Sequence, residues 1–436
     1  MQGILKKLVV EPWLYCSRRL TYAVLAKKLV RNGVMKPSCP VQGKHLLYVA
    51  ASCLPHHISG YTTRTQAVIA ALQKAGARVS VLTRPGYPWD RADRLVPGFT
   101  AEATARDTVN YHHLPYPLNN RPVVMYALQG ARKVAAYAQA QRVAAIQAAS
   151  NHVSALPALL AARKLEIPFF YEMRGLWELT RISRQPGFFN TESYQQGLQL
   201  EALVARSADR VFVISEALGR YVVDNFGVNP ENISLLPNCV DVENFPETDI
   251  SQIEPFVLGY AGSLIEYEGL DVLIKAIAGI KNTELPVCLR IIGEGEARSS
   301  LEALVQKLAL QDRVVFSGRR SPAEAHQLLQ RCAVVCIPRK AYEVCKIVTP
   351  IKLVEALAMG KPVIVPDLPV FREELGDEPA GWFFEAGNVS DLARVICEAL
   401  ASFPRQEALA EKARRHVAGH RDWQSYVKSI VEGIPA

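Results

Sequence analysis

Lys352 and Glu355 stand three residues apart in a predicted helix over 352–359, which follows a predicted strand over 334–338. A carboxylate accepts two hydroxyl hydrogen bonds at once. A lysine in the first turn adds positive charge to the helix end that attracts anions. The alternative is that Lys352 and Glu355 form only a surface pair at the i, i+3 spacing of a helix.

Two common motifs of nucleotide-using enzymes are absent. No D-x-D occurs, so the acidic pair that holds Mg²⁺ against a nucleotide diphosphate is missing. No G-x-x-x-x-G-K-[ST] segment occurs either, which disfavours a P-loop kinase or ATPase. Gly293-Glu294-Gly295 follows a predicted strand but lacks the third glycine of a dinucleotide fingerprint, so a plain tight turn explains it equally well. We expect neither a bound metal nor a cofactor.

Short apolar segments alternate with helical stretches along most of the chain. The predicted strands are 46–50, 79–83, 143–148, 168–172 and 210–214 in the first half, and 256–261, 287–292, 314–317, 334–338, 362–365 and 382–385 in the second. Such apolar strands separated by helices are typical of a parallel sheet covered on both faces. The Pro-, Asn- and Asp-rich stretch 236–255 is typical of a linker. The sequence therefore predicts two doubly wound α/β domains, with a ligand cleft beyond the carboxyl ends of the strands.

The composition is that of a globular protein. Of the 436 residues, 49% are hydrophobic and 21% are charged. The longest apolar runs fall short of the roughly 18 residues that a membrane-spanning helix needs, and we recognise no secretory signal. The nine cysteines include no C-x-x-C pair, which disfavours a zinc site or a disulfide framework. We therefore expect a cytoplasmic protein with reduced thiols.

The whole net charge of +8 lies in residues 1–45, which hold nine basic side chains and one acidic one. The remaining chain is neutral, so it lacks the basic stripe of a nucleic-acid enzyme, and we expect no nucleic-acid partner. Leu20, Ala23 and Val24 can share a helical face beside basic residues, which would hold the protein at the anionic inner face of the membrane. Alternatively, this helix packs on the first domain with its charges in water.

The chain resembles the family-4 retaining glycosyltransferases in the segment Thr349-Pro350-x-Lys352-x-x-Glu355. Members of this family have two Rossmann-like domains in the arrangement called GT-B. By resemblance, Glu355 binds the ribose hydroxyls of a nucleotide sugar, while Thr349 and Lys352 lie where the helix start meets the pyrophosphate. Many members carry another glutamate eight positions earlier, which contacts the donor sugar. Ile347 stands there in this chain, beside Lys346, as in the T-P-x-K-x-x-E variant of the family.

The segment 260–271 is similar to the first strand, loop and helix of the family's C-terminal domain. Many members have an arginine and a lysine in this loop that clamp the diphosphate, whereas this chain has Ser263 and Glu268. The resemblance places Gly262 and Ser263 near the phosphates and Gly293 and Glu294 in the nucleotide-base loop. The cations available as replacements are Arg339, Lys340, Lys346 and Lys352. For Glu268 itself we expect a solvated loop.

The segment 60–65 resembles the first loop and helix of the family's N-terminal domain. Gly60 would permit close approach to the donor phosphate or to the acceptor, with Thr62 or Thr63 as the predicted N-cap. Tyr61 and Arg64 follow on the acceptor side.

The segment 171–178 follows a predicted strand end and faces the cleft in the resembled arrangement. Glu172 and His152 then belong to the acceptor side, and Arg174 is a cation near the phosphate or the acceptor. The alternative for Arg174 is a structural bond to Glu172 or Glu178. For His152 the alternative is a cap or a satisfied surface residue.

The predicted organisation has four parts: a basic extension over 1–45, an acceptor domain over 46–240, a donor domain over 241–420, and a C-terminal helix over 421–436 that crosses back to the first domain. The resemblance implies a metal-independent, retaining hexosyltransferase with Gly60, Arg174 and Lys352 as catalytic residues. It would move a sugar from a nucleotide sugar to a saccharide or glycolipid, in surface-polysaccharide assembly. Two alternatives remain: a nucleotide-sugar epimerase or hydrolase of the same fold, and a non-catalytic partner subunit.

Overall fold

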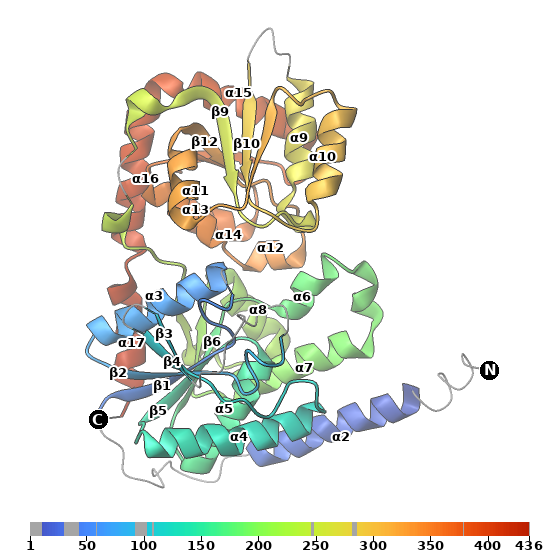
Figure 1. Ribbon diagram of the computed structural model, residues 1–436, viewed down its shortest axis with the longest axis vertical. Helices are drawn as coiled ribbons and strands as arrows, with labels where there is room; N and C mark the ends of the chain where they lie inside the picture. The colour runs from blue at the N-terminus through green and yellow to red at the C-terminus, as the bar shows by residue number, and fades with distance from the viewer. Residues whose placement is uncertain are drawn as a thin grey trace, which may run out of the picture.

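The computed structural model describes residues 11–29, 43–57, 59–91, 103–106, 109–245, 248–280, 286–377 and 379–435, with the side chains of 11–17, 103–106 and 404 left aside. Two α/β domains lie one above the other along the long axis of the molecule (Figure 1). Each contains a mainly parallel sheet with helices on both faces. The prediction of two doubly wound domains is therefore confirmed.

The sheet of the first domain has the strand order β3-β4-β2-β1-β5-β6-β7-β8, in which only β3 and β4 are antiparallel. All six residues of the central strand β1 are buried, as expected for a strand covered on both faces. The strands are β1 (His45–Ala50), β2 (Arg78–Thr83), β3 (Ala103–Arg106), β4 (Val109–His112), β5 (Ala145–Ala149), β6 (Phe169–Met173), β7 (Arg210–Val213) and β8 (Ile233–Leu235).

Helices cover both faces of this first sheet. One face packs against α4 (Val123–Ala140), α5 (His152–Leu165), α7 (Glu192–Ser207) and α8 (Glu216–Phe226). The other face packs against α3 (Gly60–Lys74) and α17 (Trp423–Gly433). The short helix α6 (Trp177–Ile182) follows β6 and lies at the end of the sheet that meets the second domain (Figure 1).

The sheet of the second domain has the order β11-β10-β9-β12-β13-β14, and all its strands are parallel. The strands are β9 (Glu254–Ala261), β10 (Cys288–Ile292), β11 (Val314–Gly318), β12 (Cys332–Cys336), β13 (Val363–Pro366) and β14 (Gly381–Phe384). One face is covered by α9 (Leu270–Gly279), α10 (Arg298–Lys307) and α15 (Val389–Ala401). On the other side lie α11 (Pro322–Gln330), α12 (Glu343–Ile347), α13 (Ile351–Ala358), α14 (Pro369–Leu375) and α16 (Gln406–His420).

The chain passes between the domains twice. The linker after β8 leads into the second domain, and α16 packs against α13 there before α17 returns to pack on α3 of the first domain. Trp423, Val427 and Ile430 of α17 are buried against that domain. The apolar face of α17 therefore ties the end of the chain to the first domain.

Helix α2 (Glu11–Leu29) packs on the first domain against α4, α5 and α7. Its inner face buries Thr21, Leu25 and Leu29, while Leu20 is 66% exposed on the outer face. Arg18 also donates a hydrogen bond to Ser193 of the domain at 3.0 Å. Residues 11–29 of the basic extension therefore form a helix that packs on the first domain, which is the alternative arrangement considered for this segment.

No helix in the part of the chain described has the length and apolar character needed to span a membrane.

Candidate active site

Two glycine-containing loops meet at the carboxyl end of the second sheet. The amide of Gly262, just after β9, donates to the Ile292 carbonyl at 2.9 Å, and the Leu264 amide donates to the Glu294 carbonyl at 3.0 Å. A Cβ on Gly293 would overlap the Gly262 carbonyl, and Gly262 and Gly293 have φ angles of +150° and +142°. Only glycine suits such a backbone and such an approach. The two loops therefore leave bare main chain at the edge where ligands bind in doubly wound sheets.

Lys352 points from the first turn of α13 toward these loops. Its Nζ donates to the Tyr260 hydroxyl at 2.9 Å and to Glu268 Oε2 at 2.8 Å. A Cβ placed on Gly262 would lie 2.6 Å from the same Nζ. Lys352 thus meets Glu268 rather than forming the surface pair with Glu355 that the spacing also allowed.

Glu268 is 3% exposed, so the expectation of a solvated loop at this position was wrong. Its Oε1 accepts a hydrogen bond from Arg339 at 3.1 Å, while its Oε2 faces Lys352. Burial alone would raise the pKa of Glu268, but Arg339 and Lys352 outweigh it and hold the pKa at about 2. Burial lowers the pKa of Lys352, and the charge of Glu268 opposes this decrease. The group is therefore two cations and one carboxylate, with a surplus positive charge at the loop edge.

Glu355 lies one turn further along α13. With Ile351 it lines a cavity of about 380 Å³ whose other walls come from α3, the linker and the start of α17. Burial raises the pKa of Glu355 to about 6, with Lys352 opposing the shift. Within the described ranges no side chain or backbone amide donates a hydrogen bond to this carboxylate. Glu355 is thus a desolvated acceptor open to the hydroxyls of a ligand.

The other residues expected on the donor side have mixed environments. Thr349 is 3% exposed, and its carbonyl accepts a hydrogen bond from Asn238. Ser263 lies in the loop after β9, where its carbonyl accepts from the Tyr260 hydroxyl at 2.9 Å. Glu294 pairs with Arg298 of α10 at the edge of the second glycine loop. Lys346 pairs with Glu343 of its own helix, which uses its charge locally rather than at the loops.

The first domain approaches this edge through two glycines. A Cβ on Gly60, at the start of α3, would lie 3.2 Å from Cγ2 of Ile351. One on Gly175 would lie 3.0 Å from Cγ2 of Val348. The N-cap of α3 is Ser59, not Thr62 or Thr63, because Ser59 and Thr62 form a reciprocal capping box. Gly60 therefore lets the start of α3 meet the start of α13.

Glu172 is the centre of a buried network beneath this contact. Its Oε1 accepts from Arg64 at 3.1 Å and from Arg174 at 2.8 Å, and its Oε2 accepts from Tyr48 at 2.6 Å. Burial would raise the pKa of Glu172, but Arg174 and Arg64 outweigh it and hold the pKa at about 2. Arg174 thus makes the structural bond to Glu172 that was its alternative interpretation. Both residues are buried and brace the first domain below the cleft.

Tyr61 and Arg64 belong to the same network. The Tyr61 ring lies 4.3 Å from the Arg174 guanidinium, and its carbonyl accepts from Arg174 at 2.9 Å. Arg64 donates to the carbonyls of Leu236 and Pro237 in the linker. These side chains join α3 to the linker, which is a scaffold role.

His152 is buried at the start of α5 rather than exposed at the surface. Its Nδ1 lies 3.0 Å from Glu201 Oε1 and 3.8 Å from Glu178 Oε1. Burial and the charge of Glu201 raise the pKa of Glu178 to about 7. Among the residues the structure describes, these three form the sole group of His, Cys, Asp or Glu side chains close enough to share a metal ion. Glu201 accepts hydrogen bonds from the amide and the ring of His152 and from the Tyr171 hydroxyl, whereas the buried Oε2 of Glu178 has no hydrogen-bond partner among the residues described.

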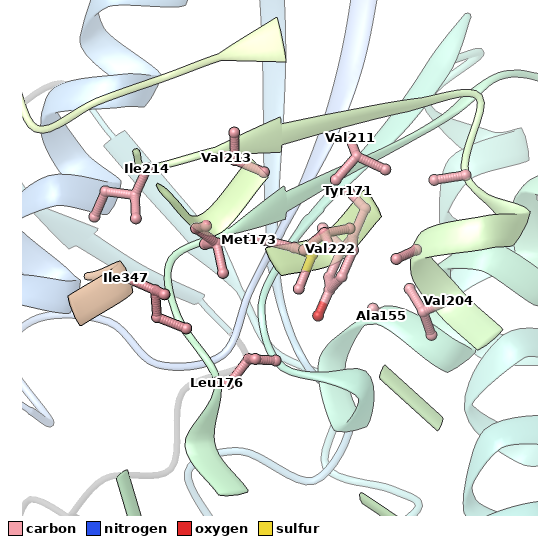
Figure 2. Packing of buried hydrophobic residues seen from close by; sticks show 14 of the residues in the cluster. Ala155, Tyr171, Met173, Leu176, Val204, Val211, Val213, Ile214, Val222 and Ile347 are labelled. Atoms are coloured by element: carbon pink, nitrogen blue, oxygen red, sulfur yellow. The ribbon is translucent and has the colours of Figure 1, made fainter. Parts of the chain in front are cut away.

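Ile347, where many members of the resembled family have a glutamate, is 6% exposed. Figure 2 shows its side chain among Met173, Leu176 and Ile214 of the first domain. Its carbonyl accepts a hydrogen bond from the Ser215 hydroxyl at 2.6 Å. Ile347 therefore joins the two domains through an apolar contact.

Two protein-family models match the chain, one for each domain. Residues 59–239 match the model described as a glycosyl transferase 4-like domain, and residues 243–416 match the model of glycosyl transferases group 1. The matches adjoin at the linker and together cover most of the chain.

Solved structures share the arrangement of both domains. Sucrose-phosphate synthase from Thermosynechococcus elongatus gives a TM-score of 0.71 at 17% identity, covering 89% of this chain and 98% of that one. The Anabaena protein HepE in complex with UDP and glucose gives 0.67 at 18% identity, covering 90% and 99%. The predicted GT-B fold is confirmed.

Curated relatives match over a shorter stretch. An MMP alpha-(1→4)-mannosyltransferase of Mycolicibacterium hassiacum is 25% identical over 256 residues, which are 58% of each chain. A Campylobacter jejuni N-acetylgalactosaminyltransferase, named for a diphospho-undecaprenol-linked acceptor, is 27% identical over 219 residues, 49% of this chain and 57% of its own. The chain thus spans nearly three fifths of the length of these two relatives.

The fold and both family models define the class: the chain has the GT-B fold, and each of its two domains matches a glycosyl transferase family. Its first domain is of the glycosyl transferase 4-like type and its second of the group 1 type.

Sequence reasoning missed Glu268 and Tyr260 as partners of Lys352, and Glu178 and Glu201 as partners of His152. The signal for Glu268 was its charge, opposite to that of the lysine found there in the resembled family.

Proposed function

We propose that the protein transfers a hexosyl group from a nucleotide-diphosphate sugar to a saccharide or lipid-linked acceptor, with retention at the anomeric carbon and without a metal ion. The observation that carries the proposal is the pair of cations, Arg339 and Lys352, beside two bare glycine loops at the carboxyl edge of the second sheet. Positive charge next to exposed main chain suits a diphosphate.

In the proposed donor complex, the glycine loops at Gly262 and Gly293 lie against the phosphates and the base. Lys352 and the start of α13 meet the diphosphate charge. Glu355 accepts the two ribose hydroxyls, a role supported by its desolvated carboxylate without a donor in the described structure. UDP bound to HepE, which has the same fold, supports a uridine nucleotide as the first donor to test.

In the proposed step, the acceptor hydroxyl attacks the anomeric carbon as the bond from that carbon to the phosphate oxygen breaks. The hydroxyl proton passes to the leaving diphosphate on the same face of the sugar, which balances the step without a protein nucleophile. The negative charge that develops on the leaving group is stabilised by Lys352. The remaining contribution of the protein is to position the reactants between Gly60 and the donor loops.

The acceptor side is proposed to lie at the first domain around Gly60 and α6. Trp177, two residues after Gly175, is 53% exposed and offers an aromatic face of the kind that stacks on sugar rings. The name of the C. jejuni relative supports a lipid-linked saccharide as one acceptor class to test. The proposed sugar transfer would take part in the assembly of a surface polysaccharide or a glycolipid.

We further propose that an anionic membrane surface is a partner. The outer face of α2 presents Arg19, Lys27 and Lys28 around the exposed Leu20, and its inner face is already used by the first domain. Each basic residue near an anionic leaflet contributes about 1 kcal/mol, so several together suffice for reversible binding.

The proposed activity is tested with a panel of UDP-, GDP-, ADP- and dTDP-linked sugars. A donor that binds the folded protein raises its melting temperature by mass action, so one nucleotide class should stand out. The stabilising donor is then incubated with saccharide and polyprenyl-diphosphate acceptors, and the products are analysed by mass spectrometry.

Sugar transfer with retained anomeric configuration supports the proposal. An altered or hydrolysed sugar nucleotide without any acceptor would instead indicate an epimerase or hydrolase. Tight binding without turnover would indicate a non-catalytic subunit, and stabilisation by none of the donors would contradict the donor site itself.

A further inference from the structure

Glu268 lies between the two cations of the donor edge. It ends the short 3-10 helix Glu266–Glu268, and Gly269, with φ +72°, turns the chain into α9. Each of its carboxylate oxygens accepts from a different cation, Arg339 at 3.1 Å and Lys352 at 2.8 Å. Its side chain is only 4% exposed, whereas that of Lys352 is 17% exposed. Glu268 therefore lies behind Lys352 when viewed from solvent.

The hydrogen bonds of Lys352 leave capacity for a ligand. An ammonium group donates three hydrogen bonds, and Tyr260 and Glu268 accept two of them. The Nζ also lies against the open side of Gly262, where any side chain would displace it. With Arg339 also donating to the Val348 carbonyl at 2.9 Å, both cations are fixed in place before a ligand arrives.

The signs of the charges distinguish this site from the resembled pattern. In that pattern the loop after the first strand supplies the cations, whereas here the loop supplies Ser263 and Glu268 and the cation comes from α13. A carboxylate in the loop is unfavourable next to a diphosphate unless a cation shields it. The Nζ of Lys352 lies 2.8 Å from Oε2 of Glu268, close enough to shield this carboxylate from a bound diphosphate.

We propose that Glu268 is a positioning residue, which holds Lys352 and Arg339 as a preorganised cation pair for the diphosphate of the donor. This inference rests on the proposed function and adds a role that Glu268 performs through other residues. A free lysine side chain loses considerable rotamer entropy when it is fixed on a ligand. Glu268 fixes Lys352 in the folded protein, so that less of this cost falls on donor binding and on the transition state.

The test compares donor affinity and kinetics in wild type, Glu268→Gln and Glu266→Gln. Glutamine keeps the size of the side chain at 268 but removes the charge that holds both cations. Glu266 is the matched control, because it lies two residues away in the same 3-10 helix and pairs with Lys340 on the exposed side. We expect Glu268→Gln to weaken binding of the nucleoside diphosphate about tenfold and to lower kcat, while Glu266→Gln behaves as wild type.

A pH profile separates positioning from general structural support. Burial lowers the pKa of Lys352 and Glu268 opposes this, so Glu268→Gln lowers the pKa of Lys352 further. In a plot of donor affinity against pH, the decrease on the basic side, where Lys352 loses its proton, should then move to lower pH by at least one unit. Lys352→Arg in the Glu268→Gln background should abolish this movement, since a guanidinium stays charged. The charged and titratable groups around Lys352 are Glu268, Arg339, Tyr260, Cys345 and Glu355.

Failure of the two proposals can be distinguished. If wild type binds no nucleotide, the proposed function fails. If wild type binds a donor and Glu268→Gln binds it with unchanged affinity and an unchanged decrease on the basic side, the positioning role of Glu268 is overturned. If Glu268→Gln does not fold, Glu268→Asp is compared with Glu266→Asp instead. Weaker binding by Glu268→Asp alone supports the proposal, and equal binding by both overturns it.

Discussion

Asn238 and Thr349 join the two domains through a buried hydrogen bond. The side-chain Nδ2 of Asn238 donates to the Thr349 carbonyl at 2.8 Å, and its Oδ1 accepts from Arg64 at 2.9 Å. Asn238 lies in the linker and Thr349 immediately precedes Pro350 and α13. The linker amide therefore connects the buried network of the first domain with the start of the donor-site helix.

Asn238→Ala should lower the free energy of unfolding by about 1–3 kcal/mol, because the Thr349 carbonyl and Arg64 both lose a buried partner. It should also weaken donor binding, since the start of α13 loses a fixed contact. Urea denaturation monitored by fluorescence measures the stability. Asn225→Ala, on the exposed side of α8, is the control. Equal stability of the two variants would show that the contact adds nothing.

Glu355→Gln should stabilise the protein at neutral pH while impairing donor binding. The pKa of Glu355 is raised by burial from 4.5 to about 6, so the folded state binds this proton more tightly than the unfolded chain. Stability from this group is present below pH 4.5 and is lost as the pH rises through 6. Removing the charge should therefore gain about 2 kcal/mol at pH 7.5 and little at pH 4.

Denaturation of wild type and Glu355→Gln at both pH values measures this difference. The exposed Glu243→Gln serves as the control and should change neither value. A loss of stability at pH 7.5 in Glu355→Gln would mean that the carboxylate has a partner in the folded state.

Sugar transfer should persist in excess EDTA. The sequence has no D-x-D, and the positive charge at the donor edge comes from Arg339 and Lys352. The rate with a defined donor and acceptor is measured after dialysis against chelator and again after adding Mg²⁺ or Mn²⁺. A strict requirement for either ion would contradict this account of how the leaving diphosphate is stabilised.

Liposome flotation should depend on acidic lipid and on the basic outer face of α2. Full-length protein should float with vesicles that contain anionic lipid and dissociate in high salt, because surface charges are screened. Lys27→Glu combined with Lys28→Glu should abolish flotation, whereas Lys428→Glu, on the exposed side of α17, should not. Flotation that is indifferent to acidic lipid, or equal for a form beginning at Gly43, would exclude the membrane as a partner.

The pattern of apolar runs was sufficient to predict both domains, because buried parallel strands are continuous apolar segments. The strands β3 and β4 at one end of the first sheet and β8 at the other were not predicted, since they lack such apolar runs. The short motif around Lys352 and Glu355 located the donor edge. It did not reveal that Lys352 meets Glu268, because that contact depends on how a loop 84 residues away folds back.

In the first domain, the sequence predicted site residues that the structure shows to be buried and paired with one another. Glu172 and Arg174 are polar residues at a strand end, a pattern that indicates a ligand site from sequence alone. The structure instead pairs them with each other, with Arg64 and with Tyr48 in the interior. Spacing along the chain cannot distinguish a polar group aimed at a ligand from one satisfied by a distant helix.

The central claim is a nucleotide-diphosphate site formed by α13 and the two glycine loops. Calorimetric titration of UDP and GDP in the presence of EDTA, into wild type and Glu355→Ala, tests it most directly. We predict one-to-one binding of one nucleotide to wild type and a loss of about 2–4 kcal/mol in Glu355→Ala, at 1–2 kcal/mol for each hydrogen bond to the carboxylate. Binding of equal strength to both proteins, or none to wild type, would contradict the account.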